Sequence, residues 1–341
     1  HAVRTLEVIE RAQRRVVGRY EVGPKYDRVI PDDYRLFQEI RIPKRAASVA
    51  VGNQIVLAEI TRYPTQTEGP EGRILKVLGD PDDPRLDSEI IIHKHELPDD
   101  FPPTILQEAA AFAPRVSADE IASRADLRGE NFFTVDGETA RDFDDAIAVS
   151  RLAGGNLRLW VAIADVSHYV KEGSNLDKEA FRRGTSVYFP ERALPMLPPH
   201  LSSGICSLNP DEDRLCLTAE MEMDPQGRMI HARFFPSVIH SRARLTYTLV
   251  KEMLLTGDRE IVDRYPSVYQ DLRTMAELCA ALRGRRRERG SIDFDLPEPE
   301  VVLDVEGQVE EIARAERHIG HHMIEEFMIA TNEAVARFLA G

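Results

Sequence analysis

Four aspartates lie close together in the stretch "TVDGETARDFDDAIAV", residues 134 to 149, and acids at this spacing are suited to binding a cation. They are Asp136, Asp142, Asp144 and Asp145. Carboxylates held this close repel one another and resist losing their water. Because apolar residues lie among and after them, the segment is expected to enter a core, where an unpaired charge is costly. The pattern predicts a metal site, with an exposed turn of solvated aspartates as the alternative, since Asp-Gly is a common turn dipeptide.

The ligand types predict which cation this site would hold. Oxygen ligands without histidine or cysteine nearby favour Mg²⁺ or Mn²⁺ over zinc. The spacing fits neither the EF-hand loop nor the DxDxT pattern of phosphatases. Mg²⁺ bound by several carboxylates most often serves phosphoryl or phosphodiester chemistry, in which the ions activate an attacking water and stabilise the leaving oxygen. We therefore expect one or two Mg²⁺ ions, with Mn²⁺ possible.

The composition of the 341-residue chain is typical of a globular protein, with 43% hydrophobic and 30% charged residues. No apolar run approaches the roughly 20 residues of a membrane span, and no signal peptide is recognisable, which predicts a cytoplasmic protein. The net charge of −14 is only weak evidence against a nucleic-acid partner, because a metal site itself needs acid. Three cysteines form no CxxC pair and are expected to be reduced and buried: Cys206, Cys216 and Cys279.

The N-terminal third of the chain has the pattern of a small β-barrel. Residues 1–16 are interpreted as a linker from a preceding domain. Five short β-like runs separated by glycine and proline occupy residues 17–98, which favours an OB-fold that binds nucleic acid or is purely structural. Candidate stacking and phosphate-contacting side chains on this barrel are Tyr20, Tyr26, Arg28, Arg41, Arg62 and Tyr63.

Residues 99–341 have a mixed α+β pattern. A proline-rich connector leads to a capping box of Ser117 and Glu120, which predicts a helix over residues 118–124. Further on, strand patterns surround the acidic stretch, and three amphipathic helices follow at the C-terminal side. The proline- and serine-rich segment 193–210 is expected to be a long irregular loop.

Several motifs together resemble one nuclease family. They are "DLRGENFFTVDGETARDFDDAIAV", "VAIADVSHYV", "GTSVYFPERALPMLPPHLSSGICSLNPDEDRLCLTAEM" and "GSIDF". In this order they resemble the catalytic domain of the ribonuclease II/ribonuclease R (RNB) family, in its bacterial ribonuclease R branch, and the barrel resembles the second cold-shock domain of that family. The resemblance implies Mg²⁺-dependent, processive 3′-to-5′ hydrolysis of single-stranded RNA to nucleoside 5′-monophosphates in the bacterial cytoplasm. Neither a DNA partner nor a membrane is expected.

The same resemblance implies roles for the four aspartates. Asp136 and Asp145 match the direct ligands of the first Mg²⁺. Asp144 matches the residue that serves the second metal or its water, and Asp142 would support that shell.

Four further residues are assigned to RNA by their place in this pattern. Tyr188 matches the tyrosine that stacks on the last RNA base, and Phe294 is expected to form the second wall of that clamp; both are core aromatics on the alternative interpretation. Arg192 and Asn209, in or beside the irregular loop, are candidates for contacts with the RNA backbone. Stacking on aromatic rings tolerates any base, as a general ribonuclease requires.

Three other patterns are interpreted more simply. His318 and His322 have helical spacing but lack the HExxH arrangement, so zinc is not expected there. His168 is expected to be a hydrogen-bonded structural histidine. The arginine run at residues 283–289 is interpreted as a solvated helix end, with an RNA-approach surface as the alternative.

The family pattern also includes parts that residues 1–341 do not contain. They are an arginine-rich segment, a catalytic glutamate, a C-terminal OB-type RNA-binding domain and a first cold-shock domain. The chain is therefore expected to be either a fragment with an RNB domain truncated at its C-terminal side or a naturally short protein, with little activity alone. A catalytically silent RNA-binding module that keeps the fold is the alternative function.

Overall fold

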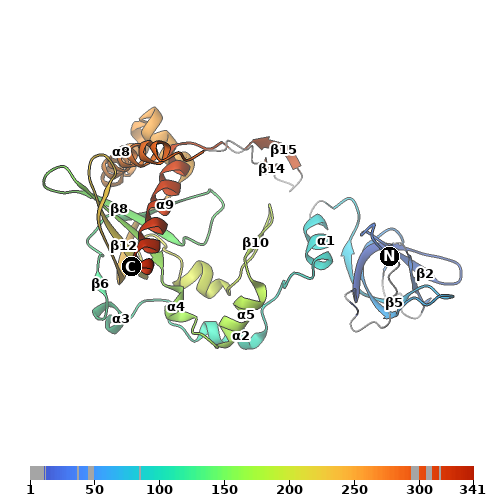
Figure 1. The fold of residues 1–341 in the computed structure, drawn as a ribbon. Coiled ribbons are helices and arrows are strands. Elements are labelled where there is room, and N and C mark those ends of the chain that lie inside the picture. The colour runs from blue at the N-terminus through green and yellow to red at the C-terminus, as the bar shows by residue number, and fades with distance from the viewer. Residues whose placement is uncertain are drawn as a thin grey trace, which may run out of the picture. The chain divides into compact units, whose positions relative to one another are not determined.

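The computed structural model describes residues 11, 13–36, 38–44, 50–83, 86–292, 299–304, 309–314 and 316–341. The chain divides into two compact units (Figure 1). One unit contains His1–Asp100, Ser186–Leu194 and Val301–Ile312, and the other contains Phe101–Thr185, Pro195–Glu300 and Ala313–Gly341. In the part of the chain that is described, no helix is both long and apolar enough to cross a bilayer.

The first unit is built on a closed five-stranded barrel, as predicted, with strand order β1-β2-β3-β5-β4. Its interior is filled by alternate residues of these strands, among them Val29, Ile40 and Val56. A helix, α1 at Leu86–Lys94, follows the last strand, although its β-branched run of three isoleucines favoured a strand. The strands are β1 Arg15–Glu21, β2 Asp27–Pro31, β3 Ile40–Ile42, β4 Ile55–Arg62 and β5 Glu71–Gly79.

The predicted RNA-stacking role of Tyr20, in the barrel, is wrong. Tyr20 is only 2% exposed, and its hydroxyl donates a hydrogen bond of 2.7 Å to the buried carboxylate of Asp27. The position lies on the inner face of β1, where the ring fills the barrel core. Arg28 and Arg62 form ion pairs with neighbouring glutamates on the barrel surface, so their predicted contacts with phosphate would compete with those pairs.

Short helices begin the second unit and include the predicted capping box. Helix α2 spans Pro103–Ala110, and α3 spans Ala118–Ala122. The Ser117 backbone donates to Glu120 at 2.7 Å, and the Ser117 hydroxyl accepts from the Glu120 backbone at 3.3 Å. These reciprocal bonds satisfy two otherwise unpaired groups at the start of α3.

A six-stranded sheet with the order β12-β9-β8-β7-β13-β6 forms the centre of the second unit (Figure 1). Strands β12 and β13 also pair with each other as a long hairpin, and β13 then continues beside β7 in parallel orientation. The strands are β6 Ala125–Asp126, β7 Phe132–Asp136, β8 Asp145–Arg151, β9 Leu157–Ala164, β12 Asp213–Met223 and β13 Met229–Thr246.

The segment between β9 and β12 contains more regular structure than expected. The predicted loop at 193–210 includes a π-helical turn at His200–Ile205, which buries Leu201 and Ile205 against α2 and α5. Burial of these apolar side chains stabilises a turn that the prolines and serines on either side conceal in the sequence. The other elements are α4 Val166–Tyr169, α5 Asn175–Arg183, β10 Val187–Tyr188 and β11 Ala193–Leu194.

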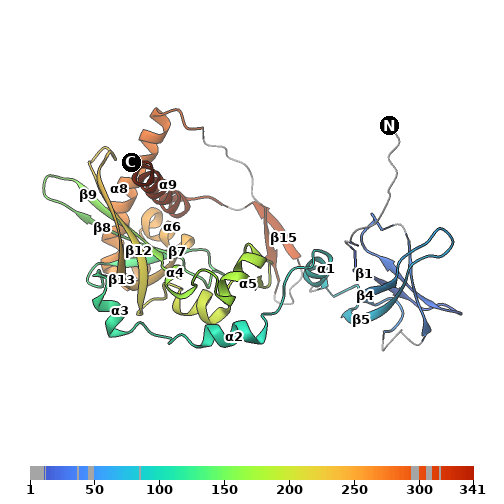
Figure 2. The same ribbon diagram turned by 60° about the horizontal axis from the view of Figure 1, so that its bottom comes forward.

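Long helices pack on one face of the sheet (Figure 2), where Phe133 and Ile147 meet Leu272 and Phe327. Phe132 and Trp160 belong to a separate core that includes Leu208 and Ile239, because successive side chains of a strand alternate between faces. All three cysteines are free and buried, as predicted. The remaining elements are α6 Tyr247–Lys251, a π-helical turn Glu252–Thr256, α7 Arg259–Arg264, α8 Pro266–Glu288, β14 Pro299–Leu303, β15 Val309–Arg314 and α9 Ile319–Ala340.

The arginine run at the end of α8 ties this helix to α9. Arg286 pairs with the almost fully buried Glu326 at 2.9 Å, and Arg289 pairs with Glu333 through both guanidinium nitrogens. The prediction of a merely solvated helix end is therefore wrong for these two residues. Their ion pairs fix the helices side by side.

Candidate active site

The acidic loop joins β7 to β8 and places its aspartates at the ends of these strands. Asp136 is the last residue of β7, and Asp145 is the first residue of β8. The two strands are antiparallel neighbours, so their adjoining ends lie on the same edge of the sheet. β13 reaches this edge as well, because Thr246 pairs with Asp136 in the parallel ladder.

Asp136 and Asp145 form an electrostatically strained pair. The pKa of Asp136 is raised from 3.8 to about 7, mainly by burial and next by the charge of Asp145, while the charge of Arg244 opposes the shift. Burial and the charge of Asp144 raise the pKa of Asp145 to about 6. The Oδ2 atom of Asp136 is buried and accepts no hydrogen bond from any residue that the structure describes. A carboxylate in this state is stabilised by a cation that replaces its lost water.

Asp144 and Asp142 occupy the outer part of the same loop. Asp144 is exposed, and its backbone carbonyl accepts a hydrogen bond of 2.9 Å from the backbone of Ala164 at the end of β9. Desolvation by the surrounding chain and the nearby charge of Asp142 raise the pKa of the Asp144 carboxyl. The structure thus brings all four predicted aspartates to one edge of the sheet.

The acidic loop is held by the segment that follows the π-helical turn. The backbone of Phe143 donates to the buried Ser207 hydroxyl at 3.0 Å, and its carbonyl accepts from Leu208 at 2.9 Å. Asn209 donates to the carbonyls of Ser203 and Gly204, so the structure gives its amide a role within this supporting loop. A contact of Asn209 with RNA stays a prediction.

Arg244 is a residue of the site that the sequence patterns did not reveal. Its guanidinium donates to the carbonyls of Gly137 and Glu138 at 2.8 and 2.9 Å, and it lies over the ring of Phe143. Arg244 therefore braces the acidic loop while its charge offsets that of Asp136.

Tyr247 is the second residue that sequence reasoning missed. Burial raises the pKa of Tyr247 to about 12, with added contributions from the charges of Asp136 and Asp145. Its ring stacks on His321 of α9 at 3.9 Å between centroids. Both missed residues are brought to the site by the parallel pairing of β13 with β7. No local pattern in "SRARLTYT" reveals this pairing.

The aspartates fit a divalent cation that retains part of its water shell. In the described part of the chain, no three histidine, cysteine, aspartate or glutamate side chains converge tightly enough to form a complete metal cage. Mg²⁺, however, keeps several waters and is commonly held by one or two carboxylates plus substrate phosphates. The coupled pair of Asp136 and Asp145, with one buried oxygen lacking a partner, matches that requirement.

The residues predicted to contact RNA belong to different units, and Asn209 shares the unit of the aspartates. Tyr188 is 66% exposed in β10 and belongs to the unit that contains the barrel, whereas the aspartates belong to the other unit. Arg192, in the same unit as Tyr188, pairs with Glu89 at 2.6 Å and lies 3.6 Å from Asp99. Phe294 lies outside the described residues. The base clamp and the backbone contacts therefore stay predictions.

His168 has the structural role that was predicted. Its Nε2 atom lies 2.7 Å from Oε1 of Glu120, the capping residue of α3. Asp165 accepts from the backbone of His168 and forms a buried ion pair of 2.6 Å with Arg124. This network joins α3 and α4 to the end of β9, next to the residue that holds Asp144.

Comparison with known proteins places both units among described families. The model of the RNB domain matches residues 124–341, and that of the cold shock domain matches residues 29–102. Ribonuclease R of Thermotoga maritima is 45% identical over 98% of this chain and 47% of its own length. Ribonuclease R of Escherichia coli is 40% identical over 98% of this chain and 41% of its own length. The chain thus spans about half the length of the curated relatives it matches.

Solved structures show the same arrangement of elements. Mycoplasma genitalium RNase R in complex with double-stranded RNA matches with a TM-score of 0.88 at 27% identity, over 99% of this chain and 59% of the other. Yeast Ssd1, described as a pseudonuclease, matches with a TM-score of 0.68 at 20% identity, over 97% of this chain and 41% of the other. The second likeness concerns the fold alone.

Proposed function

The chain belongs to the RNB domain family, and from this premise we propose that it carries the metal-binding aspartates of a 3′-to-5′ exoribonuclease. The proposed reaction is Mg²⁺-dependent, processive hydrolysis of single-stranded RNA to nucleoside 5′-monophosphates, which serves RNA degradation in the cytoplasm. The curated relatives named ribonuclease R support the reaction class. Structures of the Mycoplasma genitalium enzyme with double-stranded RNA and with ribose-methylated single-stranded RNA support an RNA substrate.

The observation that carries the proposal is the unsatisfied acid pair at the edge of the sheet. Asp136 ends β7 and Asp145 begins the neighbouring antiparallel strand β8, and burial raises the pKa of both. A structural carboxylate would be paired with a cation or several donors, whereas Oδ2 of Asp136 has neither among the described residues. The pair is suited to a divalent cation and a phosphate oxygen.

The residues of the site would divide the work as follows. Asp136 and Asp145 would bind the first Mg²⁺, Asp144 would hold a second ion or orient the attacking water, and Asp142 would support Asp144. A bound divalent cation supplies activation of water and stabilisation of the leaving oxygen. Arg244 keeps the loop in place through its two carbonyl contacts, so that the carboxylates need no rearrangement when substrate binds.

RNA is proposed to reach this site through aromatic and polar contacts. Tyr188 and Phe294 would stack on the terminal base, and Arg192 and Asn209 would contact the backbone. Arg192 would have to exchange its ion pair with Glu89 for a phosphate, so that its contribution depends on salt concentration.

The experiment compares the native chain with Asp144→Asn, with Asp126→Asn as the control. Asp126 is an exposed acid that pairs with Arg128 in a different part of the sheet. The rate at which 5′-labelled single-stranded RNA is shortened from its 3′ end in Mg²⁺ should fall at least about a hundredfold in Asp144→Asn, while RNA binding stays. The assay is run on the 341-residue chain and on the complete gene product.

The catalytically silent RNA-binding module remains the second candidate, and one observation favours it: the described residues form no complete metal cage. This module predicts that the complete gene product binds RNA and releases no nucleotide with any divalent ion. Retention of four mutually repelling aspartates favours the nuclease, because a silent module gains nothing from their electrostatic strain. Calorimetric titration with Mg²⁺ distinguishes the two candidates. The nuclease requires Mg²⁺ to bind the native chain and not Asp145→Asn, whereas the silent module has no such requirement.

A further inference from the structure

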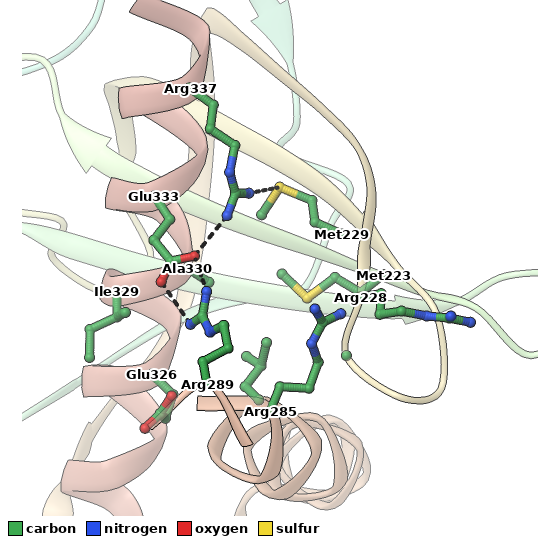
Figure 3. A pocket seen from close by; sticks show the side chains of 12 residues that line it. Met223, Arg228, Met229, Arg285, Arg289, Glu326, Ile329, Ala330, Glu333 and Arg337 are labelled. Atoms are coloured by element: carbon green, nitrogen blue, oxygen red, sulfur yellow. Dashed lines mark hydrogen bonds and ion pairs between the residues drawn. The ribbon is translucent and has the colours of Figure 1, made fainter. Parts of the chain in front are cut away.

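A cavity of about 380 Å³ lies between α8, α9 and the turn that joins β12 to β13 (Figure 3). It is remote from the acidic loop. Asp145 pairs with Ile163 of β9, whereas Met223 at the cavity pairs with Leu157 of the same strand. Six residues of extended strand correspond to about 20 Å. The cavity is therefore a separate feature at the opposite end of the sheet.

The cavity has an apolar floor and an unpaired cation. Met223, Met229, Leu282 and Ile329 contribute apolar surface. The guanidinium of Arg285, a half-buried residue, points into the cavity (Figure 3). No carboxylate in the described part of the chain pairs with it. A half-buried guanidinium without a partner loses hydration and gains nothing in return, so it favours an anionic ligand.

Two further arginines at the cavity share a single counter-ion. Arg289 and Arg337 both bind Glu333, each at 2.9 Å, and Arg337 also contacts the sulfur of Met229 (Figure 3). The guanidiniums of Arg289 and Arg337 and the carboxylate of Glu333 have a combined charge of +1. The charge of Arg285 raises the total at the cavity to +2.

The other charged residues of the lining are neutralised locally. Arg228 pairs with Asp224 within its own turn, and Glu326 pairs with Arg286. The charge of +2 is thus a local property, concentrated in one cavity of a chain whose net charge is −14. Its sign is opposite to that of the acidic loop at the other end of the sheet.

We propose that this cavity binds a phosphate monoester carried on a body the size of a nucleotide. A phosphate monoester has a charge approaching −2 at neutral pH, which matches the three arginines and one glutamate, and guanidinium groups bind phosphate oxygens in pairs. The apolar floor suits the face of a base, and methionine sulfur packs well on aromatic rings. Such a group occurs on a free nucleoside 5′-monophosphate and on the 5′-phosphorylated end of an RNA.

The first test uses AMP and adenosine as probes in calorimetric titration of the native chain, with EDTA present so that the acidic loop holds no divalent cation. AMP should bind at least about tenfold more tightly than adenosine, because only AMP presents charge-assisted hydrogen-bond acceptors to the arginines. Equal affinity for the two probes, or no binding of AMP, would overturn the proposal.

Two variants with opposite expected effects locate the binding. Arg285→Gln should weaken AMP binding about tenfold or more, since it removes the unpaired cation. Glu333→Gln should tighten it, because the change frees two guanidiniums, and a gain in affinity cannot result from misfolding. Arg287→Gln, an exposed residue of the same helix outside the cavity, is the matched control and should bind as the native chain does. AMP binding that Arg285→Gln leaves unchanged would contradict the assignment.

A comparison of two RNAs identifies the source of the phosphate. Tetra-adenylate with a 5′-phosphate should bind more tightly than its 5′-hydroxyl form if the cavity accepts an RNA end, and the difference should vanish in Arg285→Gln. Equal binding of the two RNAs, with AMP bound, identifies the free nucleotide as the ligand. Asp144→Asn should bind AMP like the native chain, so this test and that of the nuclease succeed or fail independently.

Discussion

Two aspartates, the buried Asp27 and the half-buried Asp136, lie in different compact units and have opposite electrostatic environments. Asp27 of the barrel is 2% exposed and accepts hydrogen bonds from Tyr20, Lys44 and the backbone of Gly23. Burial raises the pKa of Asp27, but these donors outweigh it and hold the pKa below its usual value. Asp136, in the acidic loop, has a buried oxygen without a donor and a pKa raised to about 7.

The difference distinguishes a structural acid from a functional one. The environment of Asp27 compensates its charge completely, so the ionised form contributes to the stability of the barrel. The environment of Asp136 compensates its charge only in part, through Arg244, and a bound cation would supply the rest. Burial alone therefore does not identify a structural residue; the number of donors around the carboxylate does.

The largest expected effect is the loss of the structural acid. Asp27→Ala leaves the Tyr20 hydroxyl and the Gly23 amide without their acceptor and should lower the free energy of unfolding of the barrel by about 3 kcal/mol. Urea unfolding followed by far-ultraviolet circular dichroism measures this loss. Trp160, the single tryptophan, lies in the other unit, so its fluorescence transition should not shift. If the barrel of Asp27→Ala unfolds at the same urea concentration as that of the native chain, Asp27 is not a stabilising acid and the contrast with Asp136 is lost.

The next effect is stabilisation by metal at the functional acids. Mg²⁺ at about 100 times its dissociation constant should raise the free energy of unfolding by about 2.7 kcal/mol. Asp145→Asn should abolish this gain, whereas the exposed control Asp126→Asn should keep it. Thermal unfolding with and without Mg²⁺ at pH 7.5 measures the difference. The same gain in Asp145→Asn would show that the ion binds elsewhere.

A smaller effect concerns pH in the absence of divalent ions. Because the pKa of Asp136 is raised from 3.8 to about 7, the folded chain binds this proton more tightly than the unfolded chain between these values. Its contribution to the free energy of unfolding therefore falls as pH rises from about 4 to 7. Asp136→Asn should remove this fall and be more stable than the native chain at pH 8 by about 1–2 kcal/mol, after allowance for solvent screening. Urea unfolding at pH 5 and pH 8 provides the measurement. If Asp136→Asn is less stable than the native chain at pH 8, Asp136 is a structural acid like Asp27.

The smallest effect is expected for an acid that is paired but exposed. Glu277 binds Arg151 at the surface, where both side chains are more than half exposed. Glu277→Gln should change the free energy of unfolding by no more than about 0.5 kcal/mol, because water already solvates both charges. Urea unfolding in 0.1 and 0.5 M salt tests this. A loss near that of Asp27→Ala would mean that pairing, irrespective of burial, determines stability.

Much of the fold could be predicted from local patterns. The five strands of the barrel follow alternation bounded by glycine and proline, and the capping box at Ser117 fixes the start of α3. The helix at Leu86–Lys94 could not be predicted, because its β-branched residues favour a strand and its packing decides otherwise. The π-helical turn at His200–Ile205 was concealed for a related reason, since its stability comes from the burial of Leu201 and Ile205.

The candidate site was predicted in part. The four aspartates are neighbours in the chain, so their clustering is visible in the printed sequence. Arg244 and Tyr247 are about a hundred positions away, and they reach the site only because β13 pairs in parallel with β7. The arginine run was visible too, but its division into helix-tying ion pairs and a free cation at Arg285 depends on where α9 packs.

The sequence by itself determined the barrel, the capping signals, the acidic loop and the resemblance to the RNB family, because these rest on periodicity and on residues that are adjacent along the chain. Only the tertiary structure decided that Asp27 has a full set of donors and Asp136 does not, that Arg244 braces the loop, and that three arginines and a glutamate shared by two of them line one cavity. The physical reason is that the energy of a charge depends on which donors, carboxylates and apolar groups surround it in space. Distant segments supply those neighbours, and no local pattern specifies how the segments pack.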